Sequence, residues 1–344
     1  MTDVRFDFGF IPSRPVADTV GLVRHGEQLG YRCAWIPDQG FHRDPFALLA
    51  VAAQATTQIG LGVGITTPFT RLPLQIARAA ATVDELAEGR LKLGLGTGNV
   101  AHVLRPLGVH YAHPVARTRD AIRIIRQLLA GDVVTFESEH DRLDHVQLEF
   151  TPQRANIPVY VGTRAPRMLE MSGAEADGVL VESLFNALPS VIERLAKGAE
   201  SAGRSPADVD VVSWQLVLVT DDPGPVVEAH KPWIARSIQI GPLEVLRQVG
   251  IDEDVIQDVT AAMDRGDAEA AAKAVTDDAV QCLMLIGTAD DMIQRIERIL
   301  GDGADAIGLV GVGSYETFSE TLTACARRVM PAFRPLTAGR EKGV

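Results

Sequence analysis

Short apolar segments alternate with helical segments along almost the whole chain, and this alternation is compatible with few folds. Residues 4–11 have the character of a buried strand and stop at Pro12, and residues 15–29 then carry apolar side chains at helical spacing. Further strand-like segments are 33–37, 59–65, 90–95, 157–162, 178–181, 211–219 and 306–310. Further helical patterns cover 46–55, 74–87, 116–129, 166–174, 188–202, 289–300 and 317–330. The alternation predicts a (β/α)8 TIM barrel, an α/β fold, with a doubly wound sheet as the alternative.

Two stretches interrupt this rhythm, after the fourth and the seventh predicted strands. Residues 132–150 hold two alternating runs around a charged middle, the second at 146–150, which is typical of a β-hairpin. Residues 223–279 are helical in pieces, with breaks expected at Pro232, Gly241–Pro242, Gly250 and Gly266. The sequence contains no linker-like or repetitive segment, so we expect a single domain over residues 1–336 and a polar C-terminal tail over 337–344.

Net charge and cysteine positions exclude several classes of partner and site. Nucleic acids and anionic membranes bind basic surfaces, so the formal net charge of −12 argues against both as partners. Cys33, Cys282 and Cys325 lie far apart and form no Cys-x-x-Cys pair, so neither a disulfide framework nor a zinc site is expected. No basic and apolar leader opens the sequence, and no run approaches the roughly 18 apolar residues of a membrane span. We expect a cytoplasmic protein that acts on a small molecule.

The segment 90–99, Arg-Leu-Lys-Leu-Gly-Leu-Gly-Thr-Gly-Asn, begins as a strand and ends rich in glycine. Gly94, Gly96 and Gly98 are placed where a bare backbone could approach a ligand, at the carboxyl end of a strand where α/β proteins bind ligands. A tight turn that merely leaves a buried strand is the alternative interpretation. The spacing is not Gly-x-Gly-x-x-Gly, so a dinucleotide fingerprint is not indicated.

In a barrel, the active site collects the residues that follow each strand. Here those residues are mostly glycine, threonine, asparagine and bulky apolar types, and the side chains that could titrate usefully are Asp38, His42, His102 and Glu182. Such a site suits a flat cofactor that brings its own reactivity. Residues 162–167, Gly-Thr-Arg-Ala-Pro-Arg at a predicted helix start, offer N–H groups, a hydroxyl and two cations to a phosphate, although an ordinary turn with exposed arginines has the same pattern.

Metal and nucleophile sites are not expected. The histidine pairs His110/His113 and His140/His145 lack the carboxylate flanks and the helical spacing of zinc or di-iron sites. The sequence contains neither Gly-x-Ser-x-Gly nor Gly-x-x-x-x-Gly-Lys-Ser/Thr. Acyl transfer by an elbow serine and phosphoryl transfer by a P-loop are therefore not indicated.

Several motifs in a fixed order carry a family resemblance. They are Ala34-Trp-Ile-Pro-Asp38, Ile59-Gly-Leu-Gly-Val-Gly-Ile-Thr-Thr-Pro68, the glycine-rich run 79–98, Pro158-Val-Tyr-Val-Gly162 and Ala176-Asp-Gly-Val179. Together with Ile286-Gly-Thr-Ala-Asp-Asp291 they resemble the bacterial luciferase-like superfamily, most closely its coenzyme F420-dependent branch. The resemblance covers nearly the whole chain. It implies a TIM-type barrel and coenzyme F420, with FMN as the alternative cofactor.

The resemblance also implies where the cofactor binds. Similar members carry a non-prolyl cis peptide as a bulge in strand 3, and matching the motif places that bond at Gly64–Ile65. The turn that contains Arg164 and Arg167 would lie near the cofactor phosphate. The implied cofactor-binding residues are Asp38, Gly64, Ile65, Thr66, Thr67, Thr97, Gly98, Asn99, His102, Gly162, Thr163, Arg164, Ala165, Arg167 and Met168.

Departures from the family pattern bear on the chemistry. Sugar-phosphate dehydrogenases of this family use a histidine and a glutamate for acid–base work, and this chain has Gln39 and Asn99 in their places. Glu182 and Phe185 replace the phosphate-binding threonine and lysine of those enzymes, so glucose 6-phosphate is not the expected substrate. Gly9 stands where the methanopterin reductases have a glutamate. The catalytic candidates are therefore Asp38, His42 and Asn99, unless water supplies the proton.

We therefore expect an F420-dependent oxidoreductase that transfers hydride between C5 of the deazaflavin and a mostly apolar organic substrate. An FMN-dependent luciferase-like monooxygenase is the alternative, and a non-catalytic flavin-binding barrel protein is the second alternative. Association through barrel helices into a homodimer is also expected. The candidate substrate contacts are Phe10, Gln39, Phe41, Phe69 and Glu182, with Trp35 as a further wall of an apolar pocket.

Overall fold

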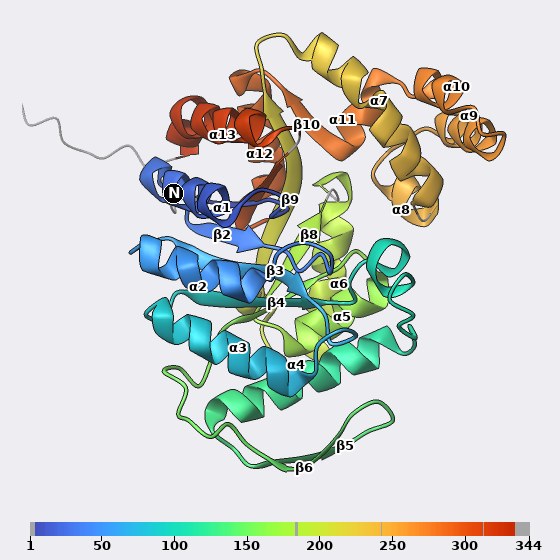
Figure 1. Cartoon of the computed structure of the whole chain (residues 1–344). Coiled ribbons are helices and arrows are strands. Elements are labelled where there is room, and N and C mark those ends of the chain that lie inside the picture. Colours follow the sequence, from blue (N-terminus) through green and yellow to red (C-terminus); the bar gives the residue numbers. More distant parts are fainter. Residues whose placement is uncertain (1–3, 183–184, 242, 312, 334–344) are drawn as a thin grey trace, which may run out of the picture.

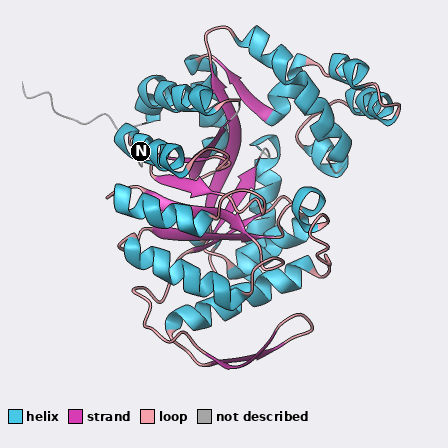
Figure 2. Cartoon of the chain, in the orientation of Figure 1, coloured by secondary structure: helices cyan, strands magenta, loops and turns pink. Residues whose placement is uncertain are grey.

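The chain forms a closed barrel of parallel strands surrounded by helices (Figure 1, Figure 2). The computed structural model describes residues 4–182, 185–241, 243–311 and 313–333. Within them eight strands close on themselves, because β8 pairs with β9 and β11 pairs with β1. The predicted (β/α)8 TIM barrel is confirmed, and the doubly wound sheet is excluded. The strands are β1 Arg5–Gly9, β2 Cys33–Ile36, β3 Gly60–Thr66, β4 Leu91–Gly96, β7 Val159–Gly162, β8 Gly178–Glu182, β9 Asp210–Val219 and β11 Ala306–Gly311.

Helices that follow the strands form the outer layer (Figure 2). They are α1 Val16–Leu29, α2 Pro45–Ala55, α3 Pro73–Leu86, α4 Pro114–Ala130, α5 Pro166–Glu175, α6 Leu188–Ser201, α12 Ala289–Gly301 and α13 Tyr315–Ala324. The main apolar core lies between the two layers and includes Phe6 and Phe8 of β1. The predicted last helix, 317–330, is wrong at its end, since α13 gives way to the π-helical turn η4 Cys325–Val329 and the 3-10 turn η5 Met330–Phe333. Within the described residues no helix is long and apolar enough to cross a membrane.

The first insertion is the predicted hairpin, which extends from the barrel beyond α4 (Figure 1). Its strands are β5 Val134–Glu137 and β6 Arg142–Val146, and they pair antiparallel. The second strand comes four residues earlier than the alternating run at 146–150 predicted. The turn explains the difference, because the N–H of Ser138 donates a hydrogen bond to the carbonyl of Asp141 and so fixes a short connection between the two strands.

The second insertion is a group of helices with one added strand: α7 Pro223–Ile240, α8 Leu243–Gln248, α9 Glu253–Asp264, α10 Ala268–Ala274, α11 Asp277–Leu283 and β10 Met284–Gly287. The expected break at Pro232 is wrong, because α7 continues through it and packs against α9, α10 and α11. The strand β10 was not predicted. It follows α11 directly and pairs with β9 alone, at Leu216–Val219. Asn186, after β8, donates a hydrogen bond to the carbonyl of Val249, so the insertion contacts the rim of the barrel.

Aromatic rings fill the barrel interior below its open end. The ring of Trp35 meets the ring of Tyr160 edge to face with centroids 5.2 Å apart, and that of Trp214 at 6.2 Å. Trp35 Nε1 donates to Asp7 Oδ2 at 3.0 Å, and burial raises the pKa of Asp7. Trp35 is fully buried. It therefore forms the floor beneath the mouth, which corrects the expectation that it lines an apolar pocket there.

Candidate active site at the barrel mouth

The strand β3 bulges at the mouth of the barrel. Val63 pairs with Leu93 and Thr66 with Leu95, so β3 has one more residue than β4 over this stretch. The peptide bond Gly64–Ile65 is cis, at the position that the family resemblance implied. Both of its residues are half-buried. The bulge therefore leaves two half-buried residues at the carboxyl end of the strands, and the Ile65 carbonyl accepts from Asp38 N at 3.0 Å.

The Ile65 side chain lies in a space that glycines leave free. A Cβ on Gly96 would come within 2.9 Å of Ile65 Cδ1, and one on Gly162 within 2.8 Å of Ile65 Cγ2. A Cβ on Gly94 would lie 2.2 Å from the carbonyl oxygen of Val63. Gly94 and Gly96 are therefore required by the backbone of the neighbouring strand and by the Ile65 side chain. This corrects the interpretation that these glycines lack side chains in order to let a ligand approach.

Asp38 joins the turns after β2 and β3. Its Oδ2 accepts hydrogen bonds from Thr66 Oγ1 at 2.9 Å and from Arg71 Nε at 2.7 Å. Arg71 also pairs with Asp44, which caps α2 by accepting from Ala47 N at 3.0 Å. Burial opposes ionisation of Asp44, but the Arg71 guanidinium and the Ala47 N–H lower its pKa overall. The sequence analysis did not include Arg71 among the site residues. It lies two residues beyond the segment 64–69 that follows the third predicted strand, so a longer segment would have included it.

The turns after β3 and β4 contact each other. Thr67 is buried, and its hydroxyl accepts from the backbone N–H two residues further on. Gly98 has a left-handed φ of 73°, and a Cβ there would lie 3.1 Å from Thr67 Cγ2. Thr97 is half-buried and Asn99 is exposed. Of the predicted threonines, Thr97 is therefore better placed than Thr66 or Thr67 to meet a ligand.

The turns after β2 and β4 also meet. Gly40 has a left-handed φ of 72°, and a Cβ there would lie 2.7 Å from Val103 Cγ1, in the π-helical turn η1 Val100–Leu104. His42 lies in the same exposed turn as Gly40. The side chain of His102, although its backbone belongs to η1, lies outside the described part of the structure.

The turn into α5 holds the residues that the sequence analysis assigns to a phosphate site. Thr163 Oγ1 accepts from Ala165 N at 3.0 Å, and Gly162 and Thr163 are half-buried. Arg164 and Arg167 are exposed beside the first turn of α5. Met168 belongs to the core, and its N–H already donates to the Ala165 carbonyl at 3.0 Å. Two cations thus border the mouth, whereas Met168 offers it no side chain.

The predicted substrate contacts differ in exposure. Phe10 stacks on Phe8, with centroids 6.1 Å apart, and lies near Phe318 of α13 in the helix layer. Phe69 is buried, with the Arg117 guanidinium 4.6 Å from its ring centroid. Phe41, by contrast, is 61% exposed.

The polar candidates lie on the rim. Gln39 is half-buried in the turn after β2, and Glu182 is exposed at the end of β8. Phe185, whose side chain lies outside the described residues, cannot be compared with them. The mouth therefore combines half-buried main chain at 64–65, 97–98 and 162 with one exposed aromatic ring and flanking cations. This arrangement can bind a flat ligand with an anionic end, while leaving the reactive group to the ligand.

Comparison with known proteins gives an independent finding. A family model described as luciferase-like monooxygenase matches residues 7–306. The 5,10-methylenetetrahydromethanopterin reductase of Methanolobus tindarius is 32% identical over 304 residues, which are 88% of this chain and 92% of that protein. The F420-dependent hydroxymycolic acid dehydrogenase of Mycobacterium tuberculosis is 30% identical over 290 residues, with 75% of this chain and 80% of that protein covered.

A solved structure agrees in fold over the whole length. The coenzyme F420-dependent tetrahydromethanopterin reductase of Methanopyrus kandleri superposes with a TM-score of 0.86 and 27% identity, and 97% of this chain and 100% of that chain are covered. The match includes both insertions, since almost the entire chain is aligned.

Proposed function

Because the chain belongs to the luciferase-like monooxygenase family, we propose that it is an F420-dependent oxidoreductase that transfers hydride between C5 of the deazaflavin and a mostly apolar organic substrate. The observation that carries the proposal is the bulge at Gly64–Ile65, where two half-buried residues lie at the mouth and the Ile65 side chain reaches Gly96 and Gly162. Two of the similar proteins, the hydroxymycolic acid dehydrogenase and the tetrahydromethanopterin reductase, are F420-dependent, which supports the choice of F420 over FMN.

The residues at the mouth fit such a cofactor. Gly64 and Gly98, both half-buried and without side chains, let a planar ring approach the backbone, and the half-buried Thr97 adds a hydroxyl. Arg164 and Arg167, exposed at the N-terminus of α5, offer cations and backbone N–H groups to a phosphate. The bound deazaflavin itself supplies the hydride chemistry. The protein is left to orient the two reactants and to exclude water.

We assign separate roles to the polar candidates. Asp38 is a positioning residue, because its Oδ2 is held by Thr66 and Arg71 and so fixes the turn after β2 against the turn after β3. His42, exposed in the turn after β2, is the proton-handling candidate, and Asn99, exposed on the neighbouring turn, is a catalytic candidate that donates and accepts hydrogen bonds without titrating. Phe41 is the proposed apolar contact to the substrate, because its ring is open to solvent.

Fluorescence titration with F420 tests the proposal. We expect saturable quenching by the wild-type protein, and at least about tenfold weaker binding by Arg164→Ala/Arg167→Ala, since two cations near a phosphate are removed. Arg298→Ala, at an exposed arginine of α12, is the control and should bind like wild type. Tight binding of reduced FMN without any F420 quenching would favour the monooxygenase alternative. Binding without turnover across a substrate panel would favour the non-catalytic one.

The proposal includes a homodimer and a cytoplasmic location. Barrel helices commonly associate through apolar surface, and closed two-fold dimers are the commonest symmetric assembly. Light scattering on the purified protein checks this directly. A mass of twice the 37.0 kDa chain is expected, and a mass of one chain would contradict the dimer.

A further inference from the structure

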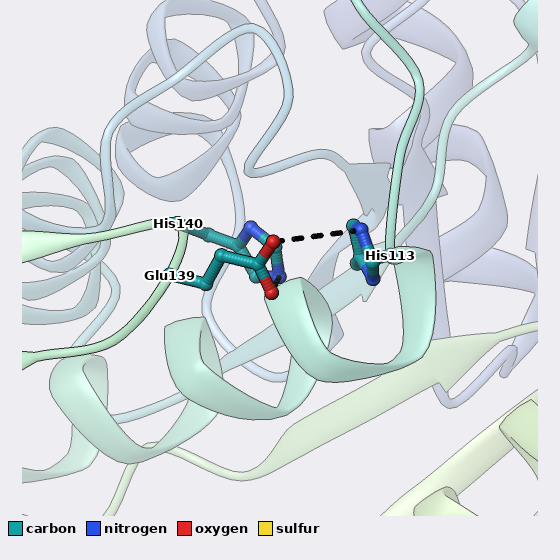
Figure 3. Close-up of side chains that lie close together, drawn as sticks. All are labelled: His113, Glu139 and His140. Atoms are coloured by element: carbon teal, nitrogen blue, oxygen red, sulfur yellow. Dashed lines mark ion pairs between the residues drawn. The ribbon is translucent and has the colours of Figure 1, made fainter.

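A cluster of two histidines and one glutamate lies where the start of α4 meets the turn of the β5–β6 hairpin (Figure 3). His113 directly precedes α4, and Glu139 and His140 lie in the turn between β5 and β6. Their ligand-type atoms all lie within 4.8 Å of one another. Glu139 Oε1 is 3.8 Å from His113 Nε2, and Glu139 Oε2 is 3.9 Å from His140 Nε2. The sequence analysis set these histidines aside because their pairs, His110/His113 and His140/His145, were judged to lack the carboxylate flanks and the helical spacing of a metal site.

The local backbone holds this arrangement in place. The turn is fixed by Ser138, whose Oγ accepts from the N–H groups of His140 at 3.2 Å and Asp141 at 3.1 Å. His113 has a left-handed backbone, with φ 50° and ψ 46°, and its carbonyl accepts from Arg117 N as α4 begins. The two imidazole rings lie nearly parallel, with centroids 4.8 Å apart. The two segments are therefore juxtaposed by ordered structure at both ends.

The spacing is close to that of a divalent metal site. Ligands at about 2.1 Å in a tetrahedral site are separated by about 3.4 Å, so the two histidine–glutamate pairs, at 3.8 and 3.9 Å, need to close by roughly half an ångström, and atoms as far apart as 4.8 Å by about 1.4 Å. Because the two imidazole rings stack nearly parallel, the exposed His113 ring must also rotate to turn its nitrogen toward a common ion. A further carboxylate oxygen, Asp141 Oδ2, is buried without a hydrogen-bond partner next to His140. The Arg117 guanidinium acts on this carboxyl, so the proposed site does not depend on its charge.

We propose that His113, Glu139 and His140 form a binding site for a borderline divalent transition metal of the Zn²⁺ class. Imidazole nitrogen and carboxylate oxygen are the ligands that such ions accept, and three protein ligands leave a fourth position for water. The bound ion clamps the hairpin to the start of α4. The site is independent of the function proposed for the mouth.

Isothermal titration of the metal-free full-length chain, without a histidine tag, tests the proposal with Zn²⁺ alone. We expect one ion per chain, and at least tenfold weaker binding by His113→Asn and by Glu139→Gln. The matched control is His145→Asn. His145 is also exposed, also has a left-handed backbone (φ 52°), and also lies beside a carboxylate, that of Asp144. Asparagine tolerates this backbone, so both substitutions preserve the local conformation.

Thermal unfolding gives a second readout that does not depend on activity. Zn²⁺ should raise the melting temperature of the wild-type protein and of His145→Asn, and should leave that of His113→Asn unchanged. The melting temperatures without metal show that each variant is folded. The proposal is overturned if wild type binds no Zn²⁺, if His113→Asn binds like wild type, or if His145→Asn loses binding equally.

Discussion

Single residues at the mouth are dictated by their neighbours more than by a ligand. Ile65 projects from the bulge of β3 toward Gly96 and Gly162, and Gly94 is bare because the β3 backbone passes close by. The sequence shows the glycines but not the side chain that requires them, because that side chain comes from another strand. The same limitation hid Arg71, whose two carboxylate partners lie 33 and 27 positions away.

Substitution of Gly94 by alanine tests this close packing. The new Cβ would meet the carbonyl oxygen of Val63 at 2.2 Å, and a backbone atom cannot turn aside as a side chain can. We expect the free energy of unfolding to fall by about 1–3 kcal/mol. Urea unfolding measures it. Gly301→Ala, where no atom lies within 4 Å of the added Cβ, should change it by no more than about 0.5 kcal/mol. Equal effects would contradict the packing argument.

The helices and strands themselves were largely predictable, and the errors have local causes. The apolar pattern located the strands of the barrel and the helices around them, because each strand is an almost continuously buried run and each helix has one buried face. Pro232 did not end α7, since packing against the other helices of the insertion outweighs one lost hydrogen bond. No turn residue separates α11 from β10, so nothing in the sequence marked the start of that short strand.

The junction of α1 with β3 depends on one carboxylate. Glu27 Oε1 accepts from the N–H groups of Thr57, Gln58 and Ile59 at 2.8, 2.7 and 3.0 Å. Burial acts in the opposite direction, but these three donors lower the pKa of Glu27 below its ordinary value of 4.5. The ionised carboxylate therefore stabilises the fold above about pH 4.5, and this contribution is lost as the pH falls through the lowered pKa.

Glu27→Gln should accordingly be destabilised relative to wild type by about 1–2 kcal/mol at pH 7, with the difference shrinking below pH 4.5. Denaturant unfolding between pH 3 and pH 7 measures the difference. Glu193→Gln, at an exposed position of α6, provides the comparison and should show little effect at any pH. A difference for Glu27→Gln that stays constant or grows toward acid pH would be incompatible with this account.

At the scale of the molecule, contacts between segments far apart in sequence complete the barrel. The barrel and both insertions were predictable from periodicity, whereas the contacts of the insertions were not. One such contact involves Asp84 of α3, which is 1% exposed and receives Arg154 through Nε at 2.9 Å and Nη2 at 2.6 Å. Arg154 also donates to the Leu91 carbonyl at 2.8 Å. It thereby fastens the segment after the hairpin to the start of β4.

Loss of Arg154 should be costly, because the buried carboxylate of Asp84 would remain without its cationic partner. We expect Arg154→Ala to lower the free energy of unfolding by about 3 kcal/mol or more. Arg298→Ala removes a long, exposed pair with Asp302 and should cost less than about 1 kcal/mol. Parallel thermal and urea unfolding of both variants gives the comparison. Similar losses of stability in the two variants would contradict the larger contribution assigned to the buried Arg154–Asp84 pair.

The account rests on a planar redox ring held by main-chain groups at the barrel mouth, and a crystal structure of the protein with bound F420 tests it most directly. The account predicts density for the ring against Gly64–Ile65 and beside Thr97, with the phosphate next to Arg164 and Arg167. Density for F420 at any other place on the chain would contradict it.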